Sequence, residues 1–200
     1  LGTEPNGFNI NAEGGSTKPE SLQKMVLAKN ADLGIALDGD GDRVIMVDRA
    51  GEVVDGDQLL FIIANAEHCS KRLIGGVVGT QMSNFGLEEA LGEKKIPFVR
   101  AGVGDRYVLA ELDKRNWVLG GESSGHLLCL NVTTTGDGVI SALQVLAAML
   151  EFDSSLGELK AGMKKYPQNM INVACQKKVD LGSQGAIKKA VARTEKKLGG

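Results

Sequence analysis

An apolar segment that runs directly into three glycine-spaced carboxylates constrains this chain more than any other feature. Residues 33–37 (Leu-Gly-Ile-Ala-Leu) have the composition of a buried strand, and residues 38–43 continue as Asp-Gly-Asp-Gly-Asp-Arg. In an extended strand the three carboxylates would spread over roughly 13 Å, because each residue advances about 3.3 Å. Glycine at positions 39 and 41 permits the backbone to curl. The segment therefore predicts a strand followed by a tight loop with converging carboxylates.

These carboxylates predict a site for a hard cation. Asp38, Asp40 and Asp42 would repel one another unless a positive charge lay between them. Oxygen ligands suit Mg²⁺, Mn²⁺ or Ca²⁺ rather than a metal that prefers thiolate. We therefore expect these three residues to bind Mg²⁺ as a cofactor. The loop would lie at the carboxyl end of its strand, where open α/β sheets place their ligands.

The residues of this loop exclude a calcium EF-hand and leave two other interpretations open, an aspartyl phosphatase and a simple turn. A calcium EF-hand requires glycine at its sixth position and glutamate at its twelfth, and here these are Arg43 and Arg49. An aspartyl phosphatase with Asp38 as nucleophile and Asp40 as acid stays open, although Asp42 stands where such a motif has a small hydroxyl or apolar residue. A solvated acidic hairpin turn between a strand over residues 33–37 and a strand over residues 44–48 also stays open, since Asp-Gly pairs are common in turns.

Composition places the chain among α/β proteins. Its 200 residues allow one or two domains, and its 42% hydrophobic and 24% charged content is ordinary for a globular protein. The 27 glycines and the 4% aromatic content point to tight turns and a core of aliphatic side chains. Helical and strand-like patterns alternate along the chain, which predicts α/β units with a parallel sheet.

Charge and cysteine content limit the partners and the compartment. A formal net charge of −2 gives no electrostatic reason to expect nucleic acid or an anionic membrane as a partner. The three cysteines are widely spaced and lack metal-site spacing, which predicts no disulfide framework and a cytoplasmic location. No stretch approaches the ~20 apolar residues of a membrane span.

Periodicity and capping residues predict the order of the elements. Helices are expected after Asp55, near Asn84 and at Asp105, which would cap its helix. Strands are expected over residues 75–79, and over 117–120 and 127–130 on either side of Glu122. A strand over 170–175 and a closing helix would follow. A long helix from about residue 136 is expected to bury Val139, Ile140, Leu143, Leu146, Ala147 and Leu150.

Several motifs accompany the acidic loop. Residues 121–126 are Gly-Glu-Ser-Ser-Gly-His, and residues 4–11, 103–108, 133–138 and 144–149 form further distinctive segments. In order and spacing, the acidic loop resembles the metal loop of the α-D-phosphohexomutase superfamily, and residues 121–126 resemble its sugar-binding loop. The further segments are similar to its bacterial phosphoglucosamine mutase branch. The resemblance covers nearly the whole chain.

The resemblance implies a fold and a domain organisation. Members of the superfamily have four domains around a central cleft, so we expect mixed-sheet α/β/α domains of the phosphohexomutase type. Residues 1–54 would complete the second domain, residues 55–167 would form the third, and residues 168–200 would begin the fourth.

It also implies an activity. Phosphoglucosamine mutases are isomerases that interconvert glucosamine 6-phosphate and glucosamine 1-phosphate through a phosphoserine and a bisphosphorylated sugar, for UDP-N-acetylglucosamine and cell-wall synthesis. The partners would be a hexosamine phosphate and the remaining domains of the polypeptide, and a homodimer stays open. Phosphomannomutase or phosphoglucomutase activity would share the same chemistry. A non-catalytic module that binds a divalent cation has only the acidic loop in its favour.

Site residues follow from the matching motifs. Arg43 would bind the transferred phosphoryl group, while Glu122, Ser124 and His126 would bind the sugar. Arg43 could instead form a surface ion pair with the acidic loop, and His126 could be structural. Asp105 and Arg106 are expected to cap and pair at a helix start.

Two family motifs are missing from the 200 residues. The superfamily carries its phosphorylated serine in a Ser-His-Asn loop and binds the substrate phosphate with an Arg-x-Ser-Gly-Thr-Glu-Pro loop. Neither motif occurs here, and neither His68 nor His126 is followed by asparagine. We therefore expect a central fragment that has no mutase activity by itself.

Overall fold

The acidic loop is the tip of an antiparallel hairpin. Strands β1 (Leu33–Leu37) and β2 (Val44–Asp48) pair from Leu33↔Asp48 to Leu37↔Val44, and β3 (Val53–Val54) adds to β2. The two predicted strands are confirmed. The loop lies at the carboxyl end of β1, as expected, but β1 pairs antiparallel with β2 and is not part of the parallel sheet that the alternating pattern predicted.

The computed structural model describes residues 1–169, 171, 174 and 183–198, which divide into two units, 1–167 and 168–200. The first unit also contains a second sheet with the order β5-β4-β6-β7. In it β4 (Val77–Thr80) is parallel to β5 (Phe98–Ala101) and to β6 (Leu119–Gly121), while β7 (Leu127–Cys129) is antiparallel to β6. The mixed-sheet α/β class is confirmed.

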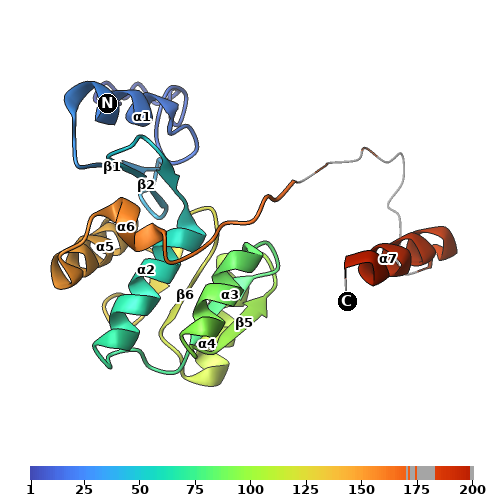
Figure 1. Cartoon of the computed structure of the whole chain (residues 1–200). Helices are drawn as coiled ribbons and strands as arrows, with labels where there is room; N and C mark the ends of the chain where they lie inside the picture. Colours follow the sequence, from blue (N-terminus) through green and yellow to red (C-terminus); the bar gives the residue numbers. More distant parts are fainter. Residues whose placement is uncertain (170, 172–173, 175–182, 199–200) are drawn as a thin grey trace. The chain divides into compact units, whose positions relative to one another are not determined.

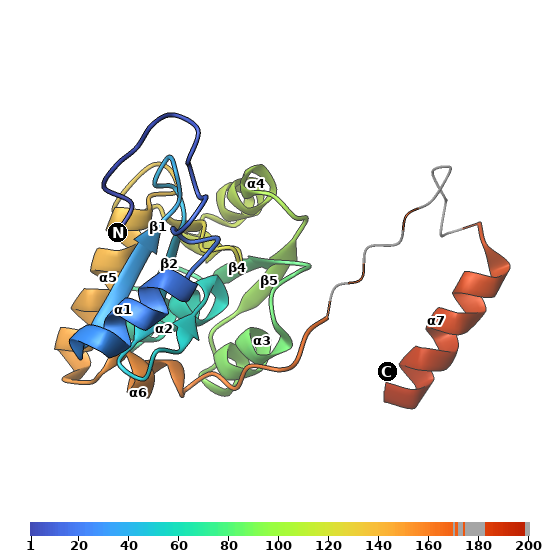
Figure 2. The same ribbon diagram turned by 90° about the horizontal axis from the view of Figure 1, so that it is seen from above.

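Helices cover both faces of this second sheet. Because side chains alternate along a strand, Val77 and Leu127 join a core with α2 (Gly56–Cys69), α3 (Phe85–Glu93) and α5 (Gly138–Phe152). Val78 and Leu128 face the opposite way and pack with α4 (Asp105–Arg115). The result is an α/β/α arrangement of three layers. The remaining helices of the unit are α1 (Glu20–Lys29), beside β1 and β2 (Figure 2), and α6 (Leu156–Lys160).

Helix α2 is the centre of the core. It contacts α3, α5, α6 and β6, and Figure 1 shows it between α5 and the sheet. Asp55 caps the helix, because its side chain accepts from the Gln58 backbone N–H and the Gln58 side chain accepts from the Asp55 N–H. The five residues from Leu59 to Ile63 are all at most 2% exposed. Each such side chain contributes about 1.5–3 kcal/mol when buried, so α2 anchors the unit.

Helix α5 buries a different face from the predicted one. Its buried residues are Gly138, Ser141, Ala142, Val145 and Ala148. The residues that the sequence predicted to be buried are instead partly or largely exposed, and Leu150 is 84% exposed. Helix α5 contacts α2, β1, β2 and β7, so its small side chains face these close neighbours. The prediction of the helix is confirmed, and that of its buried face is wrong.

The second unit is described only in part. Helix α7 (Gly185–Leu198) confirms the predicted closing helix. The strand expected over 170–175 lies largely outside the described residues. Within the described ranges, no helix is both long and apolar enough to cross a membrane.

One buried carboxylate faces the turn between β4 and α3. Asp57, in the first turn of α2, is 1% exposed, and its Oδ2 accepts from the Asn84 backbone N–H at 2.8 Å. Its Oδ1 is inaccessible and has no hydrogen-bond partner among the described residues. Burial raises the pKa of Asp57 from 3.8 to about 6, with a smaller contribution from Asp55 in the same direction and opposing hydrogen bonds from Asn84 and Ser83.

This carboxylate should make stability depend on pH. Between about pH 4 and pH 6 the folded state holds the Asp57 proton more tightly than the unfolded state does, so the free energy of unfolding falls as pH rises through that window. The full difference corresponds to on the order of 3 kcal/mol. Asp57→Asn should therefore shrink the fall in Tm between pH 5 and pH 7.5, measured by calorimetry. The exposed control Asp113→Asn should keep the wild-type profile, and an unchanged profile in Asp57→Asn would contradict the assignment.

Candidate active site

The hairpin loop brings its three carboxylates together. One carboxylate oxygen from each of Asp38, Asp40 and Asp42 lies within 4.8 Å of the other two. Gly41 has a φ of +75°, a value that suits glycine and lets the loop turn back. A Cβ at Gly39 would meet only the end of the exposed Ile10 side chain, which can move aside. The predicted convergence of the three aspartates is confirmed.

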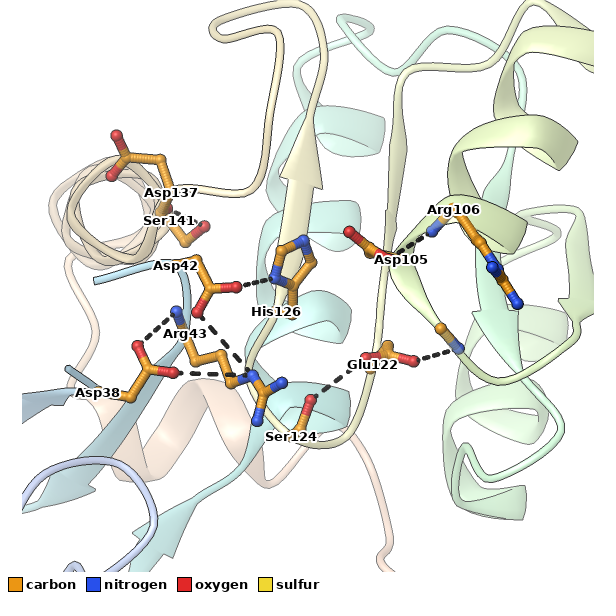
Figure 3. Close-up of polar contacts among 11 residues, drawn as sticks. Asp38, Asp42, Arg43, Asp105, Arg106, Glu122, Ser124, His126, Asp137 and Ser141 are labelled. Atoms are coloured by element: carbon orange, nitrogen blue, oxygen red, sulfur yellow. Dashed lines mark hydrogen bonds and ion pairs between the residues drawn. The ribbon is translucent and has the colours of Figure 1, made fainter. Parts of the chain in front are cut away.

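Arg43 contacts aspartates of the loop with both its backbone and its side chain. Its backbone N–H donates to Asp38 Oδ1 at 3.2 Å, and its Nε lies 3.7 Å from Asp38 Oδ2 and 3.9 Å from Asp42 Oδ1. Figure 3 shows the guanidinium beside these two carboxylates. Among the described residues, its two terminal nitrogens have no hydrogen bond or ion pair. The guanidinium thus balances part of the loop's charge and keeps the N–H donors of both terminal nitrogens for a ligand.

The carboxylates have the chemistry of a cation site. Burial raises the pKa of Asp42, and the nearby Asp38 raises it further, while His126 acts in the opposite direction. Asp42 Oδ1 is inaccessible and, within the described part of the chain, accepts no hydrogen bond. Oxygens that share one Mg²⁺ lie at most about 4.2 Å apart, since each is 2.0–2.1 Å from the ion. The observed spacing would need only a small side-chain adjustment, so the residues fit such an ion.

The predicted sugar-binding loop connects β6 to β7 and lies against the hairpin. The Val44 N–H donates to the Gly125 carbonyl at 3.0 Å, and Arg43 and His126 form an isolated β-bridge. Gly125 has a φ of +94°, and a Cβ there would lie 2.1 Å from the Val44 carbonyl oxygen. Only glycine permits so close an approach. Backbone contacts therefore join the two loops directly.

Glu122 lies at the carboxyl end of the second sheet and spans two of its loops. Its Oε1 accepts from the Gly104 backbone N–H at 2.8 Å, and its Oε2 is 3.5 Å from Ser124 Oγ. Glu122 is half-buried and Ser124 is exposed. One carboxylate oxygen is thus held by the loop before α4, and the other lies on the side of Ser124 (Figure 3).

His126 is held next to the metal loop. Its side chain is 9% exposed, and its Nδ1 lies 2.9 Å from Asp42 Oδ2 (Figure 3). On the other side, a Cβ on Gly136 would lie 2.3 Å from His126 Nε2, so the ring fits only because position 136 is glycine. The ring is enclosed between the acidic loop and the segment that leads into α5.

The expected roles of Asp105 and Arg106 at the start of α4 are wrong. The N-cap residue is Gly104, with no side-chain cap, and Asp105 is the first residue of the helix. The Asp105 carboxylate accepts from the Arg106 backbone N–H at 2.7 Å, while the Arg106 guanidinium donates to the Tyr107 hydroxyl. In Figure 3 the Arg106 side chain points away from Asp105.

The structure thus gathers the predicted residues into two adjacent groups. One contains Asp38, Asp40, Asp42, Arg43 and His126, and the other contains Glu122 and Ser124. The sequence did not predict the Asp42–His126 contact or the contact of Glu122 with the Gly104 N–H. The first joins residues 84 positions apart. The short glycine-rich segment at 102–104 was the available signal for the second.

Comparisons with known proteins identify the family of the chain. Residues 55–166 match the family model described as phosphoglucomutase/phosphomannomutase, alpha/beta/alpha domain III. The chain is 56% identical over 200 residues to the phosphoglucosamine mutase of Hahella chejuensis, and 57% identical over 197 residues to that of Cellvibrio japonicus. These alignments include 100% and 98% of this chain. The chain spans only 45% and 44% of the length of these curated relatives.

Solved structures give the same fold. An N-acetylglucosamine-phosphate mutase, described as a member of the α-D-phosphohexomutase superfamily in its product complex, superposes with a TM-score of 0.70 at 19% identity. That match covers 91% of this chain and 45% of the other. The family model alone covers more than half of the residues. The chain belongs to the phosphoglucomutase/phosphomannomutase family.

Proposed function

We propose that the polypeptide containing this chain is a phosphoglucosamine mutase of the cytoplasm, which interconverts glucosamine 6-phosphate and glucosamine 1-phosphate. The observation that carries the proposal is the direct contact between the loop of three aspartates and the loop of Glu122. The contacts Val44–Gly125 and Asp42–His126, at 3.0 and 2.9 Å, hold a cation-binding group next to a group suited to sugar hydroxyls. The 54–57% identity to phosphoglucosamine mutases supports the choice of sugar.

Each residue has a defined part in this proposal. Asp38, Asp40 and Asp42 would hold Mg²⁺, which neutralises charge on a phosphoryl group during transfer. Arg43 keeps its two terminal nitrogens for the same phosphoryl oxygens, which a planar guanidinium binds bidentately. Glu122 accepts hydrogen bonds from sugar hydroxyls, and Ser124 donates or accepts beside it. The phosphorylated serine of the reaction belongs to the polypeptide outside these residues, and so do the phosphate contacts of a further domain.

The domain limits remain part of the proposal. In this assignment residues 1–54 complete a second domain, residues 55–167 form the third, and residues 168–200 begin the fourth. The family match over 55–166 supports the middle limits. The close packing of residues 1–167 in one unit would then represent the contact between two neighbouring domains.

A comparison of three substrates tests the sugar preference. With Mg²⁺ and a hexose bisphosphate activator, kcat/KM of the whole polypeptide should be at least about tenfold higher for glucosamine 6-phosphate than for glucose 6-phosphate or mannose 6-phosphate. A site that hydrogen-bonds an amine discriminates against analogues that lack it. A preference for glucose or mannose phosphates would assign the chain to the phosphoglucomutase or phosphomannomutase branch. Cation binding without turnover on any of the three would indicate a non-catalytic module.

A further inference from the structure

His126 was expected either to bind sugar or to be structural, and in the structure its Nδ1 contacts the acidic loop. The ring is 9% exposed, and Nδ1 lies 2.9 Å from Asp42 Oδ2. A carboxylate that binds a cation is ionised and can only accept hydrogen bonds, so in the cation-binding state Nδ1 would carry the proton and donate to Asp42. The nearest cationic group is farther away, since Arg43 Nε is 3.9 Å from Asp42 Oδ1 and forms only a loose ion pair.

The backbone around this pair prevents the ring from moving independently. The β-bridge between Arg43 and His126 and the bond from the Val44 N–H to the Gly125 carbonyl fix the histidine backbone against the hairpin. Gly136 closes the other side of the ring. The Gly138 N–H also donates to the Gly41 carbonyl at 2.8 Å, so the segment that packs on the ring holds the acidic loop as well. The Asp42 Oδ2 direction is therefore set by a rigid donor.

Because Oδ2 is held by His126, Oδ1 is the oxygen of Asp42 that is left for a cation. It is this oxygen that is buried and has no hydrogen-bond partner in the described structure. We infer that His126 is a positioning residue that orients Asp42 for cation binding, and that the loop of Glu122 thereby supports the metal site. The inference rests on the metal site of the proposed function but not on its sugar or its turnover.

Mn²⁺ binding to the 200-residue chain tests this directly, with free Mn²⁺ measured by electron paramagnetic resonance. His126→Leu fills the space with an apolar side chain and removes the donor, and it should weaken Mn²⁺ binding by about tenfold or more, as expected when a group that orients a metal ligand is lost. His126→Asn retains a donor near the position of Nδ1 and should stay within about threefold of wild type. The matched control is His68→Asn, which changes the chain's other histidine, an exposed one, and should have no effect.

The outcomes are distinguishable. Wild-type affinity in His126→Leu, or equal weakening in His126→Asn and His126→Leu, would overturn the positioning role while leaving the metal site intact. A wild-type chain that binds no Mn²⁺ would overturn the metal site and this inference together. Should His126→Leu not fold, nitrogen NMR of the wild-type rings decides the question. We expect the Nδ1–H tautomer at His126 and Mg²⁺-dependent shifts at His126 but not at His68, and the Nε2–H tautomer would contradict the inference.

Discussion

In the whole polypeptide, Asp40→Asn is expected to lower the rate of phosphoryl transfer by about 100-fold or more. A metal ion that neutralises developing charge contributes several kcal/mol, and each 1.36 kcal/mol is a factor of about ten in rate. Asp40 is the best of the three proposed ligands to change, because it is exposed and its carboxylate has no hydrogen bond or ion pair to any described residue. Asp38, in contrast, accepts from the Arg43 N–H and supports the loop itself.

The measurement is the single-turnover rate from phosphorylated enzyme across a range of Mg²⁺ concentrations. Asp40→Asn should need more Mg²⁺ for half-maximal rate, and excess Mg²⁺ should restore part of the loss. Asp32→Asn, which changes an exposed aspartate paired with Arg49, is the control and should behave as wild type. A wild-type rate and Mg²⁺ dependence in Asp40→Asn would remove this carboxylate from the metal site.

Glu122→Gln should weaken sugar binding without affecting the metal. The amide oxygen can still accept from the Gly104 N–H, so the loop before α4 keeps its contact. The charge that strengthens hydrogen bonds to sugar hydroxyls is lost, which corresponds to about 1.5–3 kcal/mol, or roughly 10- to 150-fold in kcat/KM. Ser124→Ala removes a neutral hydrogen bond and should cost less, about 0.5–1.5 kcal/mol.

The direction of the reaction provides the sharper test of Glu122. In the proposed reaction the bisphosphorylated intermediate would be bound in two orientations, so Glu122→Gln should impair transfer to glucosamine 6-phosphate and to glucosamine 1-phosphate alike. Single-turnover transfer to each monophosphate measures this, with Mn²⁺ affinity as the check on the metal site. A defect in one direction only, or a loss of Mn²⁺ affinity, would show that Glu122 does not hold the sugar in both orientations.

Local features of this site could be predicted from the sequence, because they depend on neighbouring residues. The hairpin strands, the converging carboxylates and the start of α2 after Asp55 all involve positions a few residues apart. The Asp42–His126 contact could not be predicted, since it depends on how the β6–β7 loop meets β2. Strand β5 was also missed, because it is a short edge strand of partly buried residues that includes Arg100.

The buried face of α5 shows a limit of periodicity. The helix is apolar on several sides, so the pattern of large side chains does not identify the buried one. The elements packed closely against α5 determine which side is buried. A Cβ on Gly138 would lie 2.7 Å from the Leu37 side chain and 2.8 Å from the Arg43 carbonyl oxygen. Close packing against the hairpin and α2 selects small residues such as Ser141 and Ala142, and the larger Leu143 and Leu150 remain exposed.

Phosphorus NMR of the whole polypeptide with glucosamine 6-phosphate tests the central claim most directly. With Mg²⁺ and a bisphosphate activator, glucosamine 1-phosphate should form, and the same equilibrium mixture should be reached from either monophosphate. Removal of Mg²⁺ with EDTA should stop the exchange, and added Mg²⁺ should restore it. Exchange at the wild-type rate in EDTA, or in a variant with Asp38, Asp40 and Asp42 all changed to Asn, would contradict the claim that the aspartate loop and the Glu122 loop form one metal-dependent site.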